Sequence, residues 1–195
     1  MVIYFDTETT GLRPGSICQL SYVMQDKNGA KAKNMFFKVD YVEPGAQAVH
    51  GFSVYDLNRL SNGKTFADRI AEILADFNSA DLIVAHNSSF DISFFRAEFD
   101  RLGLTLPDYN TFCSMKKSLT LCKIARKSGG YKYPKLSELC AFLGVDDATI
   151  KDTCKKLYGS NAGFHDARFD TTALYLAVNR AMKDKEEFTA INNLL

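Results

Sequence analysis

The order of extended and helical patterns along the chain constrains its fold more than any other sequence feature. Three stretches rich in β-branched and aromatic residues come first, at residues 2–9, 17–26 and 31–39. Only short turn sequences separate them, and short connections join antiparallel neighbours in a sheet. We therefore predict that the sheet begins as an antiparallel meander.

Helical patterns follow and alternate with extended ones. Apolar residues recur at helical spacing over 66–77 and 92–102, and a short buried strand is predicted between them at 81–87. A further strand, two or three helices and a final helix over about 166–183 complete the pattern. This order predicts a mixed sheet flanked by helices, of the α/β or α+β class.

Size and composition bound the class of protein. The chain has 195 residues, 46% of them hydrophobic, and no internal repeat or linker, so we predict a single domain over 1–195. A formal net charge of +1 gives no global attraction to nucleic acid or membrane. No apolar run approaches the roughly 18 residues of a membrane span. The chain is expected to be soluble and cytoplasmic, with no membrane partner.

Two acids stand in the first predicted strand. Because alternate residues of a strand share a face, Asp6 and Glu8 lie on the same face as Val2 and Tyr4. Carboxylates so close repel each other unless a cation lies between them, and hard oxygen ligands suit Mg²⁺ or Mn²⁺. The alternative is that the strand has already ended and both acids are solvated.

A third acid lies on an apolar helix face. Asp170 shares the inward stripe of the last predicted helix, where an unpaired acid is destabilising. It either pairs with Arg168 or a lysine, or belongs to a functional site. His165 lies just ahead of this helix, and Asp166 is a candidate helix cap.

A fourth acid follows the buried strand at 81–87. A helix is predicted to begin at about Asp91, so this residue is either an N-cap or another carboxylate delivered from a strand end.

Three motifs occur in the order and spacing of a known family. They are Asp6-Thr7-Glu8, His86-Asn87 with Phe90-Asp91, and His165-Asp166-Ala167-Arg168-Phe169-Asp170. Together they resemble the motifs of the DEDDh, or DnaQ-like, 3′–5′ exonucleases, whose members include the epsilon-type exonuclease domain of DNA polymerase III. The resemblance covers residues 2–181, and Asp rather than Tyr at position 166 is typical of the histidine branch.

The resemblance implies a fold and a chemistry. The implied fold is α/β and ribonuclease H-like: a central mixed five-stranded sheet, with three antiparallel strands first and parallel strands after, flanked by helices. The implied site holds two divalent ions, Mg²⁺ or Mn²⁺, on Asp6, Glu8, Asp91 and Asp170. His165 is then expected to be the general base. The expected products are nucleoside 5′-monophosphates.

The resemblance also implies substrate-binding residues. Thr9, Gly11 and Leu12 extend the first motif toward the 3′ nucleotide, and His50 begins an H-G-F-S segment similar to one in the family. Asn87 and Phe90 belong to the second motif, and Phe90 either stacks on a base or fills the core.

A basic segment is a further candidate for substrate binding. Residues 109–137 contain seven basic side chains and no acidic ones, and Lys116, Lys117 and Lys132 are the expected phosphate contacts. The alternative is a solvated helix face and loop.

Several alternatives stay open from sequence. DNA with a single-stranded 3′ end is the favoured substrate, RNA is the alternative, and a non-catalytic binding module is the rival of another class. A DNA polymerase is a candidate partner. Because the chain ends about a dozen residues after the last helix stripe, free-standing action or a homodimer is favoured. The tail at 182–195 is either a docking segment or a frayed end.

Overall fold

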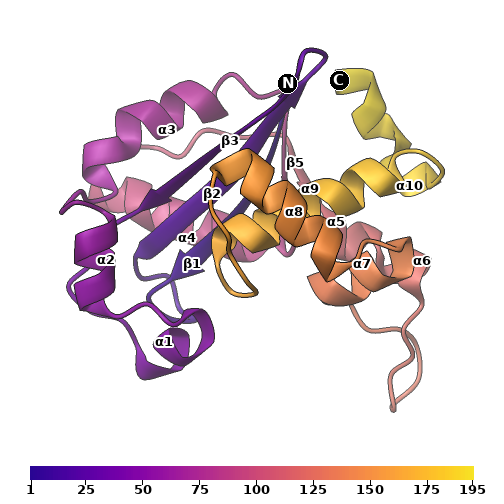
Figure 1. Cartoon of the computed structure of the whole chain (residues 1–195), viewed down its shortest axis with the longest axis horizontal. Helices are drawn as coiled ribbons and strands as arrows, with labels where there is room; N and C mark the ends of the chain where they lie inside the picture. The colour runs from indigo at the N-terminus through magenta and orange to yellow at the C-terminus, as the bar shows by residue number, and fades with distance from the viewer.

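A mixed five-stranded sheet forms the centre of the computed structural model, which describes residues 1–195 (Figure 1). The strand order is β3-β2-β1-β4-β5. The first three strands pair antiparallel, whereas β4 is parallel to β1 and β5 is parallel to β4, which confirms the predicted arrangement. The strands are β1 Val2–Thr9, β2 Ile17–Asp26, β3 Gly29–Phe36, β4 Leu82–Ala85 and β5 Thr111–Cys113.

Helices cover both faces of this sheet. The helices are α1 Pro44–His50, α2 Val54–Leu60, α3 Ile70–Phe77, α4 Ser88–Arg101, α5 Ser114–Lys117, α6 Leu119–Cys122, α7 Leu136–Leu143, α8 Asp147–Tyr158, α9 Ala167–Ala181 and α10 Glu186–Thr189. Two short 3₁₀ turns, Ala67–Arg69 and Ala190–Leu194, precede α3 and follow α10. None of the helices is long and apolar enough to cross a membrane.

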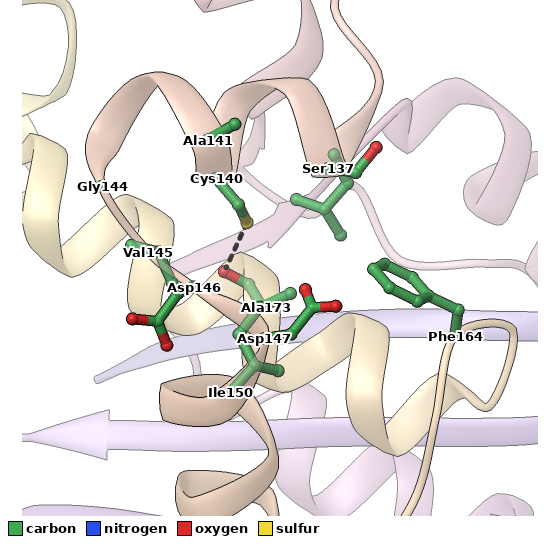
Figure 2. Close-up of a pocket in the computed structure, with 11 residues that line it drawn as sticks. Ser137, Cys140, Ala141, Gly144, Val145, Asp146, Asp147, Ile150, Phe164 and Ala173 are labelled. Carbon is green, nitrogen blue, oxygen red and sulfur yellow. Dashed lines mark hydrogen bonds between the residues drawn. The ribbon is translucent and has the colours of Figure 1, made fainter.

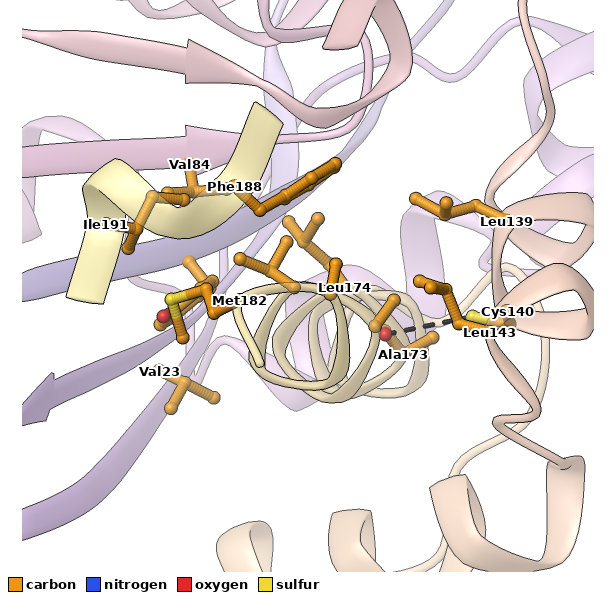
Figure 3. Close-up of a cluster of buried hydrophobic side chains, with 14 of the residues drawn as sticks. Val23, Val84, Leu139, Cys140, Leu143, Ala173, Leu174, Met182, Phe188 and Ile191 are labelled. Atoms are coloured by element: carbon orange, nitrogen blue, oxygen red, sulfur yellow. Dashed lines mark hydrogen bonds between the residues drawn. The ribbon is translucent and has the colours of Figure 1, made fainter. Parts of the chain in front are cut away.

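The alternation of side chains along β1 divides the core in two. Val2 and Tyr4 point into one hydrophobic cluster, which α7, α8 and α9 complete. Figure 3 shows part of this cluster, with Leu139 and Leu143 of α7 beside Ala173 and Leu174 of α9. Ile3 and Phe5 point the opposite way, into a cluster that α3 and α4 complete. The central strand is therefore buried on both faces, and a polar residue near its end lies beside a helix whichever way it points.

Helix α9 packs against β1 and β2 through small side chains. Ala173, Ala177 and Ala181 are each at most 2% exposed, and they recur at the four-residue spacing of one helix face. Small residues let the helix axis approach the sheet closely. The first turn of α9 is thereby brought beside the carboxyl end of β1.

Two local predictions differ from the structure. Helix α4 begins at Ser88, three residues before Asp91, because Asn87 turns the chain with a left-handed φ of 74°. The short helices α1 and α2 were not predicted, since seven residues each are too few for a clear helical periodicity.

The C-terminal tail folds back onto the core. Phe188 and Ile191 are 0% and 1% exposed, and both belong to the cluster beneath α9. The ring of Phe188 packs against Phe112 of β5, with a distance of 5.2 Å between the ring centroids. Residues 186–194 thus close the end of the core next to β5.

Candidate active site

Three of the four predicted acids converge on one point at the end of β1. Carboxylate oxygens of Asp6, Glu8 and Asp170 lie within 4.8 Å of one another. Asp6 and Glu8 share the face of β1 that carries Val2 and Tyr4, as predicted, and α9 brings Asp170 onto that face. The alternative in which the strand ends early and its acids are solvated is wrong, because β1 continues to Thr9.

A β-bulge ends β1 beside the acids. The register with β2 shifts between Glu8 and Thr9, so that Glu8 faces Gln19 while Thr9 faces Ile17. The extra residue is Cys18, so the bulged strand is β2, which bends here. β1 ends at Thr9, and the residues after Thr9 form one wall of a cleft.

The start of α9 is fixed by a polar network that excludes Asp170. Asp166 caps the helix by accepting a hydrogen bond from the backbone N–H of Arg168, and it pairs with the Arg168 guanidinium at 2.6 Å. Gln19 of β2 donates to Asp166 at 2.9 Å and accepts from the backbone N–H of Ala167 at 3.1 Å. Arg168 is thus the partner of Asp166, and the predicted alternative of an Arg168–Asp170 pair is wrong.

The acids raise one another's pKa. Burial, together with the charge of Asp170, raises the pKa of Glu8 to about 8. Burial raises the pKa of Asp170 to about 7, although its carboxylate accepts a 3.0 Å hydrogen bond from the backbone N–H of His165. The pKa of Asp6 is raised well above its ordinary value by burial and by the charges of Asp170 and Asp91. A cation bound between these carboxylates would offset their mutual repulsion.

Asp91 approaches the same point from the opposite face of the sheet. It is 3% exposed, lies in the first turn of α4, and accepts a 2.7 Å hydrogen bond from the Thr7 hydroxyl. Its charge raises the pKa of Asp6 and Glu8, so it is close enough to act on the cluster although it is not one of the compact group of three. Asn87 occupies the N-cap position of α4, so the N-cap alternative for Asp91 is wrong.

The donor set fits hard divalent cations. Asp6, Glu8, Asp170 and Asp91 offer oxygen ligands alone, with no neighbouring Lys or Arg paired to any of them. Oxygen-only sites of this kind suit Mg²⁺ and Mn²⁺ rather than metals that prefer sulfur or imidazole. The family-wide dependence on divalent ions is therefore consistent with these residues.

His165 lies in the exposed loop directly before the α9 cap. Its backbone has a left-handed φ of 62°, which directs its N–H to Asp170 and leaves the side chain exposed. Burial lowers the pKa of His50, and the charge of His165 lowers it further.

A cleft of about 280 Å³ opens beside Glu8. This size lies near the lower end for small-ligand sites, about 300 Å³. The end of β1, the turn after it, α1 and the start of α4 form its walls: Thr7, Glu8, Thr9, Gly11, Leu12, Glu43, Gly45, Ala46, Val49, His50 and Phe90. Five residues predicted to bind substrate are among them: Thr9, Gly11, Leu12, His50 and Phe90.

The cleft residues divide into fixed and free side chains. The Thr9 hydroxyl donates to the Gly11 carbonyl at 2.8 Å, and Nδ1 of His50 accepts from the backbone N–H of Phe52 at 3.0 Å. Phe90 lines the cleft while its ring packs on Phe94, at 4.9 Å between centroids, so it serves the core and the wall together. Leu12 is 86% exposed and free to meet a ligand.

The remaining predicted substrate residues lie outside this cleft. Asn87 turns the chain into α4, and its side-chain oxygen accepts a hydrogen bond from the Ser89 hydroxyl. Lys116 and Lys117 are exposed on the short helix α5. Lys132 forms an ion pair with Glu138.

A second cavity lies beside the N-terminal half of α9. Its volume is about 530 Å³, and it is enclosed by α7, α8, α9 and the half-exposed ring of Phe164 (Figure 2). Ala173, one turn after Asp170 on α9, forms part of its floor. The lining is mostly apolar and includes none of the predicted metal-binding acids.

Two residues of the site were not predicted from the sequence. Thr7 holds Asp91, and the signal for it was present, because alternation places Thr7 on the face opposite Asp6. Glu43 lines the cleft next to Gly11, where a Cβ added to Gly11 would lie 2.4 Å from the Glu43 carboxyl carbon. No local pattern marks Glu43, since 32 positions separate it from Gly11.

The sequence matches the exonuclease family model called RNase_T over residues 3–178. The chain belongs to this exonuclease family. The match includes all three motifs and most of the sheet and its flanking helices, so the resemblance seen in the motifs is confirmed.

Relatives of this RNase_T-family chain include subunits of a DNA polymerase. It is 33% identical over 156 residues to the DNA polymerase III subunit epsilon of Salmonella typhimurium, and 32% identical over 156 residues to that of Escherichia coli. These alignments cover 75% of the chain but only 61% of each relative. The chain therefore spans about three-fifths of the length of these relatives.

Solved structures confirm the RNase_T-family fold. The E. coli ExoI–ssDNA complex in its zinc-bound form superposes with a TM-score of 0.67 at 18% identity, covering 98% of this chain and 42% of ExoI. The nuclease domain of 3′hExo, a DEDDh family member bound to rAMP, superposes with a TM-score of 0.64 at 13% identity. That alignment covers 96% of this chain and 92% of the domain.

Proposed function

We propose that this chain is a metal-dependent 3′–5′ exonuclease that releases nucleoside 5′-monophosphates from the 3′ end of nucleic acid. One observation carries the proposal: Asp6, Glu8 and Asp170 converge within 4.8 Å, with raised pKa values, beside a nucleotide-sized cleft. Repulsion between buried carboxylates lowers stability unless a cation offsets it. A non-catalytic binding module that holds no cation would be destabilised with no gain in function.

The four acids are the proposed metal ligands. Asp6, Glu8 and Asp170 would hold divalent ions from one face of β1, and Asp91 would reach them from the start of α4. Two ions, Mg²⁺ or Mn²⁺, bound there supply positive charge that offsets the charge of the phosphodiester and of the departing 3′ oxygen.

His165 is the proposed general base. Its exposed ring would accept the proton of the water that attacks the phosphorus atom, and histidine is the side chain best suited to do so near neutral pH. The backbone N–H of His165 meanwhile holds the Asp170 carboxylate in place.

The cleft beside Glu8 is the proposed site of the 3′-terminal nucleotide. The exposed Leu12 would pack against the base, while Thr9, Gly11, His50 and Phe90 shape the walls around it. We expect these side chains to contact the nucleotide without base-specific hydrogen bonds, so a substrate of any sequence would be accepted.

DNA with a single-stranded 3′ end is the proposed substrate, supported by the relatives that are subunits of a DNA polymerase. The alternative is RNA or short oligoribonucleotides, because 3′hExo, which shares the fold, was captured with rAMP. We also propose a DNA polymerase as a candidate partner, or else action as a free-standing enzyme or homodimer. Light scattering of the protein, alone and mixed with a polymerase, distinguishes these states.

Timed digestion of matched 5′-labelled single-stranded DNA and RNA tests the proposed activity. We expect a ladder that shortens from the 3′ end only with Mg²⁺ or Mn²⁺, and that is lost in Asp170→Asn. The relative rates on DNA and RNA rank the two substrates. Binding of both strands without cleavage of either would instead favour the non-catalytic module.

A further inference from the structure

A basic hairpin projects from the fold between α6 and α7 (Figure 1). The backbone of Lys132 donates to the Ile124 carbonyl, that of Arg126 donates to the Gly130 carbonyl, and Ala125 pairs with Tyr131. We call residues 123–135 the basic arm. Gly129 and Gly130, both with positive φ, form its tip.

The root of the basic arm is tied to the second motif. Nε2 of His86 lies 3.0 Å from the carbonyl oxygen of Pro134, and Nδ1 lies 2.9 Å from the Ser114 hydroxyl. A carbonyl only accepts, so Nε2 carries the proton of this ring. Because His86 follows β4 and precedes Asn87, the arm begins at the same end of the sheet as the acids.

The charge of the arm is unbalanced. It contains five basic residues and no acidic one: Lys123, Arg126, Lys127, Lys132 and Lys135. Only Lys132 forms an ion pair, with Glu138 of α7. Lys123, Arg126 and Lys127 form no ion pair, so a polyanion can bind them by displacing their counterions.

The aromatic residues of the arm share a face. Tyr131 and Tyr133 are two positions apart on the returning strand, so they point to the same side, while Lys132 points to the other side and reaches α7. Each tyrosine is 45% exposed. Two half-exposed rings flanked by basic residues offer surfaces on which unpaired bases can stack.

We propose that the basic arm binds the single-stranded nucleic acid on the 5′ side of the cleaved nucleotide, with Tyr131 and Tyr133 stacking on unpaired bases and Arg126 and Lys127 contacting phosphates. This inference rests on the proposed function for the polarity of the strand. Binding by the basic arm would make activity depend on substrate length, because a substrate of one nucleotide reaches the acids but not the arm. Lys132, already paired with Glu138, is not among the proposed contacts.

Binding of fluorescent (dT)₂₀ and (rU)₂₀ in EDTA, followed by anisotropy, tests the arm without cleavage. We expect Tyr131→Ala/Tyr133→Ala to weaken binding about fivefold or more for each stacked base. Arg126→Gln/Lys127→Gln should lower the slope of log affinity against log salt by about 1.4, or about 0.7 for each phosphate contact. Matched controls are Lys155→Gln/Lys156→Gln on the exposed side of α8 and Tyr55→Ala on α2, which should bind as wild type.

Hydrolysis of the p-nitrophenyl ester of thymidine 5′-monophosphate separates the arm from the active site. Both arm variants should hydrolyse this ester at the wild-type rate while losing kcat/KM on (dT)₂₀. Wild-type binding of (dT)₂₀ and (rU)₂₀ by both variants would overturn the arm proposal. If the wild-type protein hydrolyses neither the ester nor any strand, the proposed function is overturned instead. The anisotropy measurement would still show whether the basic arm binds single-stranded nucleic acid.

Discussion

The hydroxyl of Thr7 donates a 2.7 Å hydrogen bond to the carboxylate of Asp91, which lies 84 positions further along the chain. Thr7 points away from Asp6 and Glu8, so this bond joins the α4 side of the sheet to the acids on the α9 side. A single strand thus presents two acids directly and holds a third through the residue between them.

Thr7→Val should weaken metal binding and activity together. Valine keeps the shape of threonine but cannot donate to Asp91, and loss of such a supporting hydrogen bond typically costs about 10- to 100-fold in metal affinity or activity. The bond also lowers the pKa of Asp91, so its removal should raise that pKa above about 7 and shift the pH–rate profile upward. Mn²⁺ titration measures the loss of metal affinity, and the pH–rate profile measures the shift. Thr7→Ser keeps the hydroxyl and should restore both the wild-type metal affinity and the wild-type profile.

Asp170→Asn should stabilise the metal-free protein at pH 8 but not at pH 4. The folded-state pKa of Asp170 is raised to about 7 from an ordinary value near 4. Below pH 4 the carboxyl is protonated in both states, so it does not affect stability. Between pH 4 and 7 the unfolded state releases this proton while the folded state keeps it, so the fold loses stability as pH rises, and the loss is complete above pH 7. At 2–4 °C per kcal/mol, the variant should melt at least about 2 °C higher at pH 8. Melting in EDTA checks this, with exposed Asp152→Asn as the control.

Metal should reverse the same destabilisation. Saturating Mn²⁺ at pH 8 is expected to raise the melting temperature of the wild-type protein, because a ligand that binds only the folded state stabilises it. The rise should be much smaller in Asp6→Asn. An equal rise in both proteins would place the metal elsewhere.

His165→Asn should reduce kcat by roughly 100- to 10,000-fold, the usual contribution of a general base. Asparagine tolerates the left-handed φ of 62° and keeps the backbone N–H that Asp170 accepts, so the fold and the acid cluster are retained. Affinity for (dT)₂₀ should change little. Single-turnover kinetics and anisotropy measure the two quantities, and an unchanged kcat would remove His165 as the base.

Gly11→Ala should disturb the cleft through Glu43. The new methyl group would lie 2.4 Å from the Glu43 carboxyl carbon, so this exposed side chain must move. We expect a higher KM with a stability change below about 1 kcal/mol, because a flexible side chain gives way cheaply. The double variant Gly11→Ala/Glu43→Ala should have the wild-type KM. A KM that stays high in the double variant would show that the backbone at position 11, and not Glu43, causes the effect.

Phe188→Ala should destabilise the protein by about 3–5 kcal/mol, the usual cost of removing a buried aromatic ring. Phe188 is fully buried against Phe112 and the cluster beneath α9. Urea unfolding measures the loss. A change below about 1 kcal/mol would show that the tail is loosely attached in solution.

Features of this protein that depend on local spacing could be predicted from the sequence. Alternation in β1 placed Asp6 and Glu8 on one face, and the helical stripe placed Asp170 inward, because strand and helix periods follow from backbone geometry alone. The three motifs then indicated the family, which the match over residues 3–178 confirms.

The pairing of distant side chains could not be predicted from local spacing. That Arg168 pairs with Asp166, that Thr7 holds Asp91, and that Glu43 lies against Gly11 depends on packing between segments far apart in the chain. The start of α4 at Ser88 likewise depended on the left-handed turn at Asn87, which no periodicity reveals. Local sequence sets the direction of a side chain, but its partner is set by the helices and strands that burial of the two cores brings together.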